Sequence, residues 1–498
     1  MPSDLREQID KIMHACASEV DRQMVQWSGA CDPVSFRRME LEVAATGRAL
    51  SDGVTGIILT SMVGNVDFQV AASLAARAAQ GYRSGGQREV SVTLLGGNEV
   101  RVAVAYLKVD RRGARGQRRR NGRRGRGGTG VYPVLAALGI GQGVTPALAG
   151  EICRQVTDSD SVRSGRAALD RRGIDLGHKQ TLRIVNHFSR RAVEQRNQWL
   201  ADARRHPAES GPLRGKRVVI ATDGGRLRER CPAGRGRRRT ETGHRRYDAP
   251  WREPKLLTVY VIGDDGKIEN EFRPIYDGTL GDADAIFAML AGYLRALGAH
   301  EARELILLGD GAKWIWDRAP RLITEVGIAA ARVHQIIDWC HAVGVLHEIA
   351  EARVKWPPKE RERWIRRAKN LLHRGKTDEL LALIDALAVG RRAKAVSQHR
   401  DYFARNSARM QYAASEAAQR PTGSGAIESA VRRVVNMRMK SNGMFWLEVN
   451  AEGMLLLRSY LKSEHFDALV NWSLAATVPW WTSLPTTMPT PLNCQRAA

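Results

Sequence analysis

The segment Arg217-Val-Val-Ile-Ala-Thr-Asp223-Gly-Gly sets the expected fold of this chain. Its β-branched and apolar run predicts a buried strand, and the Asp-Gly-Gly that follows predicts a turn at the carboxyl end of that strand. A second segment, Leu305-Ile-Leu-Leu-Gly-Asp310-Gly, has the same construction. Because ligand sites in open α/β sheets form at the carboxyl ends of strands, both aspartates are candidate site residues.

Further strands surround these two segments. A strong hairpin signal, Gly263-Asp-Asp-Gly266, joins the second and third expected strands. A helix over 282–297 leads to the fourth strand. Three antiparallel strands followed by helix, strand, helix and strand predict an RNase H-like mixed five-stranded sheet in a multidomain α/β chain. The expected strands cover 217–222, 256–263, 268–275, 304–309 and 331–337.

A third acidic residue stands later in the chain, in Gly423-Ser-Gly-Ala-Ile-Glu428-Ser at the start of a helical pattern. A charged, all-helical stretch over 342–420 precedes it and interrupts the α/β region. An Asp-Gly pair by itself usually marks only a turn, but two aspartates at strand ends followed by a helical glutamate predict a shared site. Clustered carboxylates repel one another, and divalent cations relieve that repulsion.

Carboxylate oxygens are the ligands that Mg²⁺ prefers, together with water and phosphate. Two such ions roughly 4 Å apart activate an attacking oxygen and stabilise a leaving one. We therefore expect Asp223, Asp310 and Glu428 to hold two Mg²⁺ or Mn²⁺ ions for phosphoryl transfer.

The composition favours a polyanionic partner. Among 498 residues, 78 Lys and Arg oppose 53 Asp and Glu, giving a formal net charge of +25. The segment 111–126 is almost only Arg and Gly and cannot bury a core, so it predicts either a phosphate-binding arm or a solvated linker. A second basic loop spans 226–246. The arginines expected to contact DNA in these segments are Arg118, Arg119, Arg120, Arg123, Arg124, Arg237 and Arg238.

The first 205 residues predict helices and one hairpin. An apolar stripe over 5–27 either pairs two chains or packs on its own domain. Two alternating runs, 89–95 and 100–107, flank a Gly96-Gly-Asn turn and predict the hairpin. Short helices over 136–205 resemble either a helix-turn-helix or an ordinary helical bundle. In the first case the residues facing the major groove are Lys179, Gln180 and Arg183.

Seven segments are expected on this basis. They are 1–87 (helical), 88–135 (hairpin and basic arm), 136–210 (DNA-binding helices), 211–341 (first part of the core), 342–420 (all-α insertion), 421–478 (final core helices) and 479–498 (disordered tail). The six cysteines form no CxxC pair, which argues against a zinc ribbon and fits a reducing cytoplasm. No apolar run is long enough to cross a membrane.

Five motifs give the chain a resemblance to a known family. They are ATDGGRL around Asp223, LLGDGAKWIW around Asp310, DWCH over 338–341, GSGAIES around Glu428, and RMKSNGMFW over 438–446. The chain resembles bacterial insertion-sequence transposases of the DDE class, specifically the ISKra-type group. The resemblance implies that Asp223, Asp310 and Glu428 are the metal ligands, and that the helical stretch before Glu428 is an insertion domain.

The same resemblance suggests roles for other residues. His341 would contact the scissile phosphate or order the site, or else is a structural histidine. Arg438 and Lys440 would meet DNA phosphates. Relatives often carry cysteine pairs near the hairpin, where this chain has the Arg/Gly run instead.

The resemblance implies a DNA transposase that acts in the bacterial cytoplasm, in association with the nucleoid. It would bind the ends of its own insertion element and a target duplex as a homodimer or larger assembly. The alternatives are an RNase H-like nuclease or resolvase without strand transfer, and a domesticated DNA-binding protein. An intact carboxylate triad argues against the last of these, because a pure binding protein gains nothing from three clustered negative charges.

Overall fold

The computed structural model describes residues 3–29, 32–80, 82–109, 130–232, 247–351, 356–389, 393–475, 492 and 494. They belong to two compact units, Met1–Arg191 with Asp467–Pro491, and Ala192–Phe466 with Leu492–Ala498. Several predictions fall outside the described residues: the basic arm 111–126 with Arg118, Arg119, Arg120, Arg123 and Arg124, the loop residues Arg237 and Arg238, and most of the tail 479–498.

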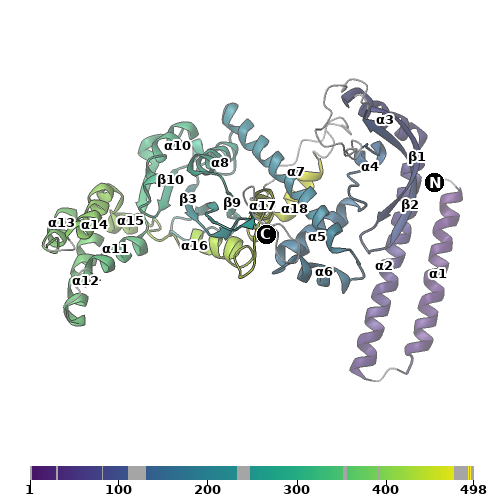
Figure 1. Ribbon diagram of the computed structural model, residues 1–498, viewed down its shortest axis with the longest axis horizontal. Helices are drawn as coiled ribbons and strands as arrows, with labels where there is room; N and C mark the ends of the chain where they lie inside the picture. Colours follow the sequence, from purple (N-terminus) through teal and green to yellow (C-terminus); the bar gives the residue numbers. More distant parts are fainter. Residues whose placement is uncertain are drawn as a thin grey trace. The chain divides into compact units, whose positions relative to one another are not determined.

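The first unit begins with helices α1 (Ser3–Trp27), α2 (Pro33–Gly64) and α3 (Val66–Gln80). Asp32 starts α2, because its carboxylate accepts hydrogen bonds from the amides of Val34 and Ser35 at 2.8 and 3.1 Å. Helix α1 packs along α2 of the same chain (Figure 1), and Ile12 of the apolar stripe lies against Gly53 of α2. The pairing of two chains through this helix stays a prediction.

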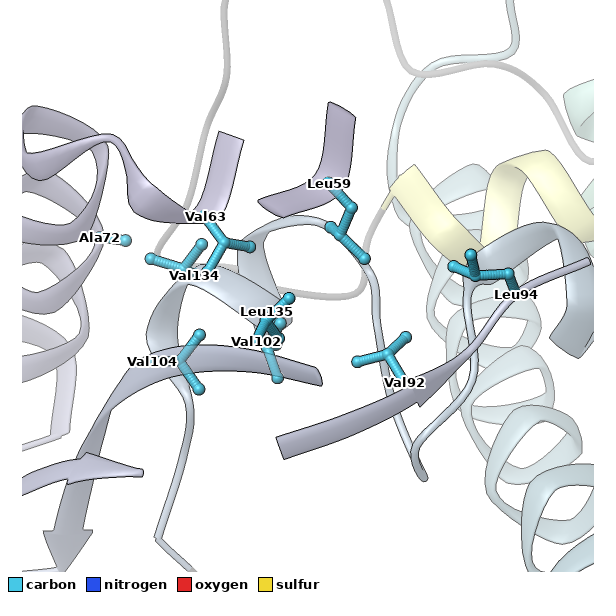
Figure 2. Packing of buried hydrophobic residues seen from close by; sticks show 9 residues of the cluster. All are labelled: Leu59, Val63, Ala72, Val92, Leu94, Val102, Val104, Val134 and Leu135. Atoms are coloured by element: carbon cyan, nitrogen blue, oxygen red, sulfur yellow. The ribbon is translucent and has the colours of Figure 1, made fainter. Parts of the chain in front are cut away.

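The expected hairpin is confirmed as β1 (Tyr82–Thr93) paired antiparallel with β2 (Glu99–Val109). Asp52 of α2 fixes its turn by accepting hydrogen bonds from the amides of Gly96 and Asn98 at 2.9 and 3.0 Å. Figure 2 shows the core that this hairpin covers, where alternate strand residues pack on α2, α3 and α4 (Pro133–Ala137). Its buried members are Leu59, Val63, Ala72, Val92, Leu94, Val102, Val104, Val134 and Leu135.

The described part of the first unit also contains α5 (Pro146–Asp158), α6 (Val162–Asp170), the first part of α7 (His178–Arg205) and all but the first residue of α18 (Phe466–Ala475). Helix α5 continues to Asp158, and α6 begins at Val162. Ser161 then caps α6 by accepting a hydrogen bond from the Ser164 amide at 3.0 Å. Residues 159–161 form the short turn between α5 and α6.

The second unit is built on a five-stranded mixed sheet in the order β11-β10-β3-β8-β9. Strands β3, β8 and β9 pair antiparallel, whereas β10 and β11 run parallel to β3. Helix α8 (Ala283–Ala296) connects β9 to β10 and starts at the N-cap Asp282. The strands are β3 (Arg217–Gly224), β8 (Lys255–Ile262), β9 (Ile275–Thr279), β10 (Glu304–Gly309) and β11 (Val333–Ile337).

The prediction of a third strand over 268–275 is wrong, because β9 begins only at Ile275. The Gly263–Gly266 turn forms, yet beyond it only Ile268 bridges back to Ile262. The sequence of β9 contains Asp277 and Gly278, which indicate a turn. Their place inside a buried strand depends on distant partners, since Asp277 accepts hydrogen bonds from Arg196 and Tyr293 at 2.7 and 2.5 Å.

Helices follow the sheet, and the described part of the predicted helical segment 342–420 is helical as expected. Figure 1 shows α11 to α15 gathered beside the part of the sheet that ends in β10 and β11. The helices are α9 (Lys313–Trp316), α10 (Ala319–Val326), α11 (Trp339–Glu351), α12 (Pro358–His373), α13 (Thr377–Asp385), α14 (Ala393–Asn406), α15 (Tyr412–Ala417), α16 (Gly425–Val431), α17 (Glu448–Lys462) and α18 (Phe466–Ala475).

Within the described residues, no single helix is long and apolar enough to cross a membrane. The bent pair Pro33–Gly64 and Val66–Ala79 meets the length and composition criteria only when the two helices are taken together, across a 65° break.

Candidate active site

The sheet places Asp223 and Asp310 side by side. Leu308 of β10 pairs with Ala221 of β3 in parallel register, and each aspartate lies two residues beyond its strand partner. Both line one cavity of about 180 Å³ at the carboxyl ends of these strands. The other residues of that cavity are Thr222, Gly224, Gly225, Arg226, Glu253, Trp314 and Ile315.

Asp223 is half-buried, and its surroundings disfavour the carboxylate form. Burial raises its pKa, and the nearby carboxylates Asp310 and Glu428 raise it further. The Gly224 amide, which donates a hydrogen bond to Oδ1 at 2.7 Å, opposes this shift, as does His341. The charges of Asp310, Glu428 and His341, the three other residues predicted to form the catalytic site, therefore all act on Asp223.

The turn that carries Asp310 is held from two sides. The Ala312 amide donates a hydrogen bond to its Oδ1 at 2.9 Å, and the indole of buried Trp316 donates one to its backbone carbonyl at 2.7 Å. Next to it, Gly311 lies against the ring of Tyr402 on α14, so closely that a Cβ there would overlap the ring. The helical segment therefore packs directly on the Asp310 turn.

Asp338 connects β10 to helices α11 and α16, which carry His341 and Glu428. Its amide donates to the carbonyl of Gly309 on β10 at 2.8 Å, and its Oδ1 accepts from the His341 amide at 2.7 Å. Its Oδ2 accepts from the Ser424 amide, just before α16. One fully buried carboxylate thus caps α11 and fixes the start of the helix that carries Glu428.

Glu428 is exposed in the first turn of α16, where the Ser424 hydroxyl donates a hydrogen bond to its Oε1 at 3.2 Å. The helix then continues as a π-helix over Arg432–Asn436. Such π-helical turns often lie at functional sites. His341 is also exposed, in the first turn of α11.

The predicted DNA-contacting residues differ in exposure. Lys179 and Arg183 are exposed on α7 in the first unit, with Gln180 half-buried between them, and Lys440 is exposed in the second unit. The expectation that Arg438 meets a phosphate is wrong for this structure. Its side chain is only 4% exposed and its guanidinium lies over the ring of Trp446, 5.4 Å from the centroid.

Two residues of the site did not emerge from the sequence as members of it. Arg226 and Glu253 line the cavity with the two aspartates. Asp338 belongs to the DWCH motif, and in the structure it organises the helices around the cavity. Arg226 stands two residues after the Asp223-Gly turn, and its charge was read only as part of a basic loop. No local sequence pattern marks Glu253 as a site residue, because its position beside the cavity depends on the pairing of β8 with β3.

The chemistry of the donor set suits a hard divalent cation. Asp223, Asp310 and Glu428 offer carboxylate oxygens. Burial is the main cause of the raised pKa of Asp223, the two other carboxylates add to it, and a bound cation would favour its charged form. In the conformation described, no group of three or more His, Cys, Asp or Glu side chains among the described residues is arranged to hold a metal ion. Binding would therefore require side-chain movement, for which exposed Glu428 has the freedom.

A larger cavity, of about 560 Å³, lies in the first unit and contains none of the candidate catalytic residues. It is lined mainly by apolar and glycine residues of the hairpin, α4 and α7. The smaller cavity beside Asp223 and Asp310 combines these carboxylates with exposed Arg226 and the ring of Trp314.

The sequence matches no model of a known protein family and no curated protein. The functional assignment therefore depends on the geometry and chemistry of the site.

Proposed function

We propose that this protein is a DNA transposase of the DDE class with an RNase H-like core. The observation that carries the proposal is that Asp223 and Asp310, from adjacent parallel strands, line one cavity, while Glu428 is close enough to raise the pKa of Asp223. The five-stranded mixed sheet, with three antiparallel strands and two strands parallel to β3, supports the RNase H-like part of the proposal.

Asp223, Asp310 and Glu428 would hold the divalent ions. When bound, such ions activate the attacking oxygen and stabilise the leaving one. The chain itself supplies the remaining functions. Arg226, exposed at the cavity, attracts the phosphate of the strand to be cut, and Asp338 holds the two helices that bring His341 and Glu428 to it.

Two reactions follow at this one site. Water first attacks the phosphorus at the end of the element, the bond from phosphorus to the 3′ oxygen breaks, and that oxygen takes a proton to become a 3′-hydroxyl. The hydroxyl then attacks a phosphodiester of the target, which joins the two DNAs and releases a new 3′-hydroxyl on the target strand. Neither reaction needs a covalent bond to the protein.

The positive charge of the chain indicates the kind of partner that it binds. A formal net charge of +25 favours a polyanion, and Lys179, Arg183, Arg226 and Lys440 are exposed cations. Duplex DNA satisfies both this charge and the chemistry of a phosphodiester site.

Strand transfer tests the proposal directly. The purified protein, Mg²⁺, an oligonucleotide duplex ending in the DNA that flanks the gene, and a target duplex should give joined products. Chelation of the metal or Asp310→Asn should abolish joining, while Asp401→Asn, at an exposed position on α14, should leave it intact.

The alternatives predict different results. Cutting without joining of a supplied 3′-hydroxyl would favour a nuclease or resolvase. DNA binding with neither reaction, in the wild type as in Asp310→Asn, would favour a domesticated binding protein.

A further inference from the structure

A narrow β-ribbon leaves the sheet immediately after Asp223. Strand β4 (Leu227–Arg228) pairs with β7 (Trp251–Arg252), and β5 (Cys231–Pro232) pairs with β6 (Tyr247–Asp248). The segment around Trp446 lies along its edge, since the Trp446 amide donates to the Arg228 carbonyl at 2.9 Å and the Arg230 amide donates to the Trp446 carbonyl at 2.7 Å. These bonds hold the ribbon against the chain that follows α16.

Arginine and aromatic side chains alternate on one face of this ribbon. The guanidinium of Arg228 lies 4.9 Å from the ring centroid of Trp251 and 5.9 Å from that of Phe445. The guanidinium of Arg230 lies 4.4 Å from the ring of Tyr247, which contacts Phe445 edge-on at 5.3 Å. We call these five residues the ribbon face.

The ribbon face is accessible. Trp251 is 53% exposed and Tyr247 is 37% exposed, although aromatic side chains of this size usually bury most of their surface. Both arginines are exposed as well. Glu229, which lies between them in sequence, faces the other side of the ribbon and pairs with Arg252 at 2.9 Å. Among the described residues, no ion pair of Arg228 or Arg230 with an acid is found.

The ribbon face is also continuous with the candidate active site. Arg226 and Glu253, which line the cavity with Asp223 and Asp310, directly adjoin β4 and β7 in sequence. The two strands of the ribbon thus lead from cavity-lining residues directly to Arg228 and Trp251.

From this arrangement we infer that the ribbon face binds the unpaired bases of a DNA strand leaving the active site. Exposed aromatic rings accept bases by stacking, whatever the base, and unpaired arginines between them neutralise the backbone phosphates. A closed duplex offers no base faces to these rings, so the surface selects single-stranded or frayed DNA. The inference rests on the proposed function only in taking the bound strand to be the one that is cut.

Binding of labelled DNA to the full chain tests the inference. The probes are an oligothymidylate of about 12 nucleotides and a blunt duplex of equal length, at a salt concentration that suppresses general electrostatic binding. Trp251→Ala should weaken single-strand binding by about 10-fold, within the range of about 5- to 150-fold that one stacked base contributes. Trp251→Phe should restore most of the affinity.

Two controls accompany these variants. Ile268→Ala removes a side chain of similar exposure, 48%, elsewhere in the same unit and should leave single-strand affinity unchanged. Photocrosslinking of an oligonucleotide carrying 5-iododeoxyuridine should give adducts on Trp251, Tyr247 or Phe445, which identifies the surface independently of affinity.

The outcomes separate the inference from the proposed function. Unchanged single-strand affinity in Trp251→Ala, or an equal loss for single strand and duplex, would overturn the inference even if the protein joins DNA ends. Selective loss of single-strand binding, with adducts on the ribbon face, would support it even if no joining is found.

Discussion

Asp223 is held in the folded protein at an energetic disadvantage as an anion. Burial and two neighbouring carboxylates raise its pKa, and only one backbone amide and His341 act in the opposite direction. The folded state therefore binds this proton more tightly than the unfolded state does. By linkage, the free energy of unfolding decreases as pH rises from the ordinary aspartate pKa through the raised pKa of Asp223.

The substitution Asp223→Asn should consequently stabilise the protein at pH 7, because it removes a charge that is desolvated and repelled. We expect Tm to rise by about 1–3 °C, which in a domain of this size corresponds to an increase in the free energy of unfolding of less than about 1 kcal/mol. DNA cleavage should be lost. Thermal unfolding at pH 7 and at pH 4 measures the effect, which should shrink at the lower pH. Asp401→Asn, at an exposed position, serves as the control and should not change Tm.

Asp338 illustrates a different role, that of a buried carboxylate satisfied by backbone amides. Asparagine caps helices as well as aspartate does, so Asp338→Asn should preserve the start of α11. It would, however, turn an amide N–H toward the Ser424 amide, which now donates to the carboxylate. One unsatisfied donor in a buried position costs about 1–3 kcal/mol, measurable by urea unfolding.

The same variant should lower the rate of strand transfer more than the affinity for DNA, because the start of the Glu428 helix loses its anchor. A variant with wild-type strand-transfer rate would show that Ser424 does not need Asp338 to place α16.

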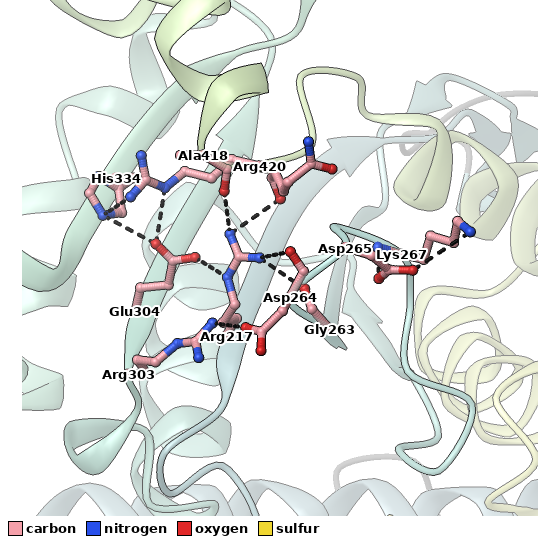
Figure 3. A network of polar contacts seen from close by, with 11 residues as sticks. Arg217, Gly263, Asp264, Asp265, Lys267, Arg303, Glu304, His334, Ala418 and Arg420 are labelled. Atoms are coloured by element: carbon pink, nitrogen blue, oxygen red, sulfur yellow. Dashed lines mark hydrogen bonds and ion pairs between the residues drawn. The ribbon is translucent and has the colours of Figure 1, made fainter.

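At the scale of elements, an ionic network secures the amino ends of the strands, opposite the cavity. Figure 3 shows Arg217 of β3 bonded to Glu304 of β10 at 2.5 Å and to the carbonyls of Gly263 and Ala418 at 2.8 Å. Arg420 bonds the second Glu304 oxygen at 3.0 Å. The network thus ties the end of the helical segment to the sheet, a few residues before α16 begins.

Two acid–base groups make this network sensitive to pH. Burial would raise the pKa of Glu304, but hydrogen bonds from Arg217 and Arg420 outweigh it and lower the pKa. Burial and Arg420 lower the pKa of His334, whose Nε2 lies 3.0 Å from the Arg420 guanidinium, with Glu304 acting in the opposite direction. Each group has a lowered pKa in the folded state, so the stability it contributes is present above its unfolded pKa and is lost as pH falls.

We therefore expect the free energy of unfolding to decrease first below about pH 6.5, as His334 takes a proton, and again below about pH 4.5, as Glu304 does. Glu304→Gln should lower the free energy of unfolding at pH 7 by an amount near the lower end of about 3–5 kcal/mol. The loss stays at the lower end because the carbonyls of Gly263 and Ala418 still accept hydrogen bonds from Arg217. Urea unfolding across this pH range measures both effects.

Glu269→Gln provides a matched control. It removes a carboxylate paired with Lys216 at 2.8 Å, next to Arg217 in sequence but more exposed, and should cost no more than about 1 kcal/mol. Equal losses in the two variants would contradict a special role for Glu304.

At the scale of the whole molecule, positive charge is concentrated in segments as well as on the folded surface. The Arg/Gly segment 111–126 contains nine of the 78 Lys and Arg residues within a short length. Each phosphate neutralised on duplex DNA contributes about 0.9 to the slope of log affinity against log salt concentration. Deleting 111–126 should therefore reduce the slope by several units, measured by fluorescence anisotropy with duplex DNA.

The same deletion should leave the ratio of affinities for single-stranded and duplex DNA nearly unchanged, since the ribbon face remains. An unchanged salt slope would identify the segment as a linker without phosphate contacts.

Local sequence patterns predict many of the elements of this protein. The buried runs of β3, β8 and β10, the helix that starts at Asp282 and the Gly96-Gly turn are local signals that depend on neighbouring residues. The three acids of the candidate site were also identifiable, because each follows a strand or opens a helix.

Which residues meet depends on the folding of the whole chain. The strand β9 contains Asp277, which a distant arginine and tyrosine satisfy, and Arg438 is buried against Trp446 instead of facing DNA. Asp338 contacts Ser424, which lies far along the chain beyond five helices. Local preferences come from a few adjacent residues, whereas burial and hydrogen-bond partners depend on contacts made across the chain, and these contacts create both the exceptions and the site.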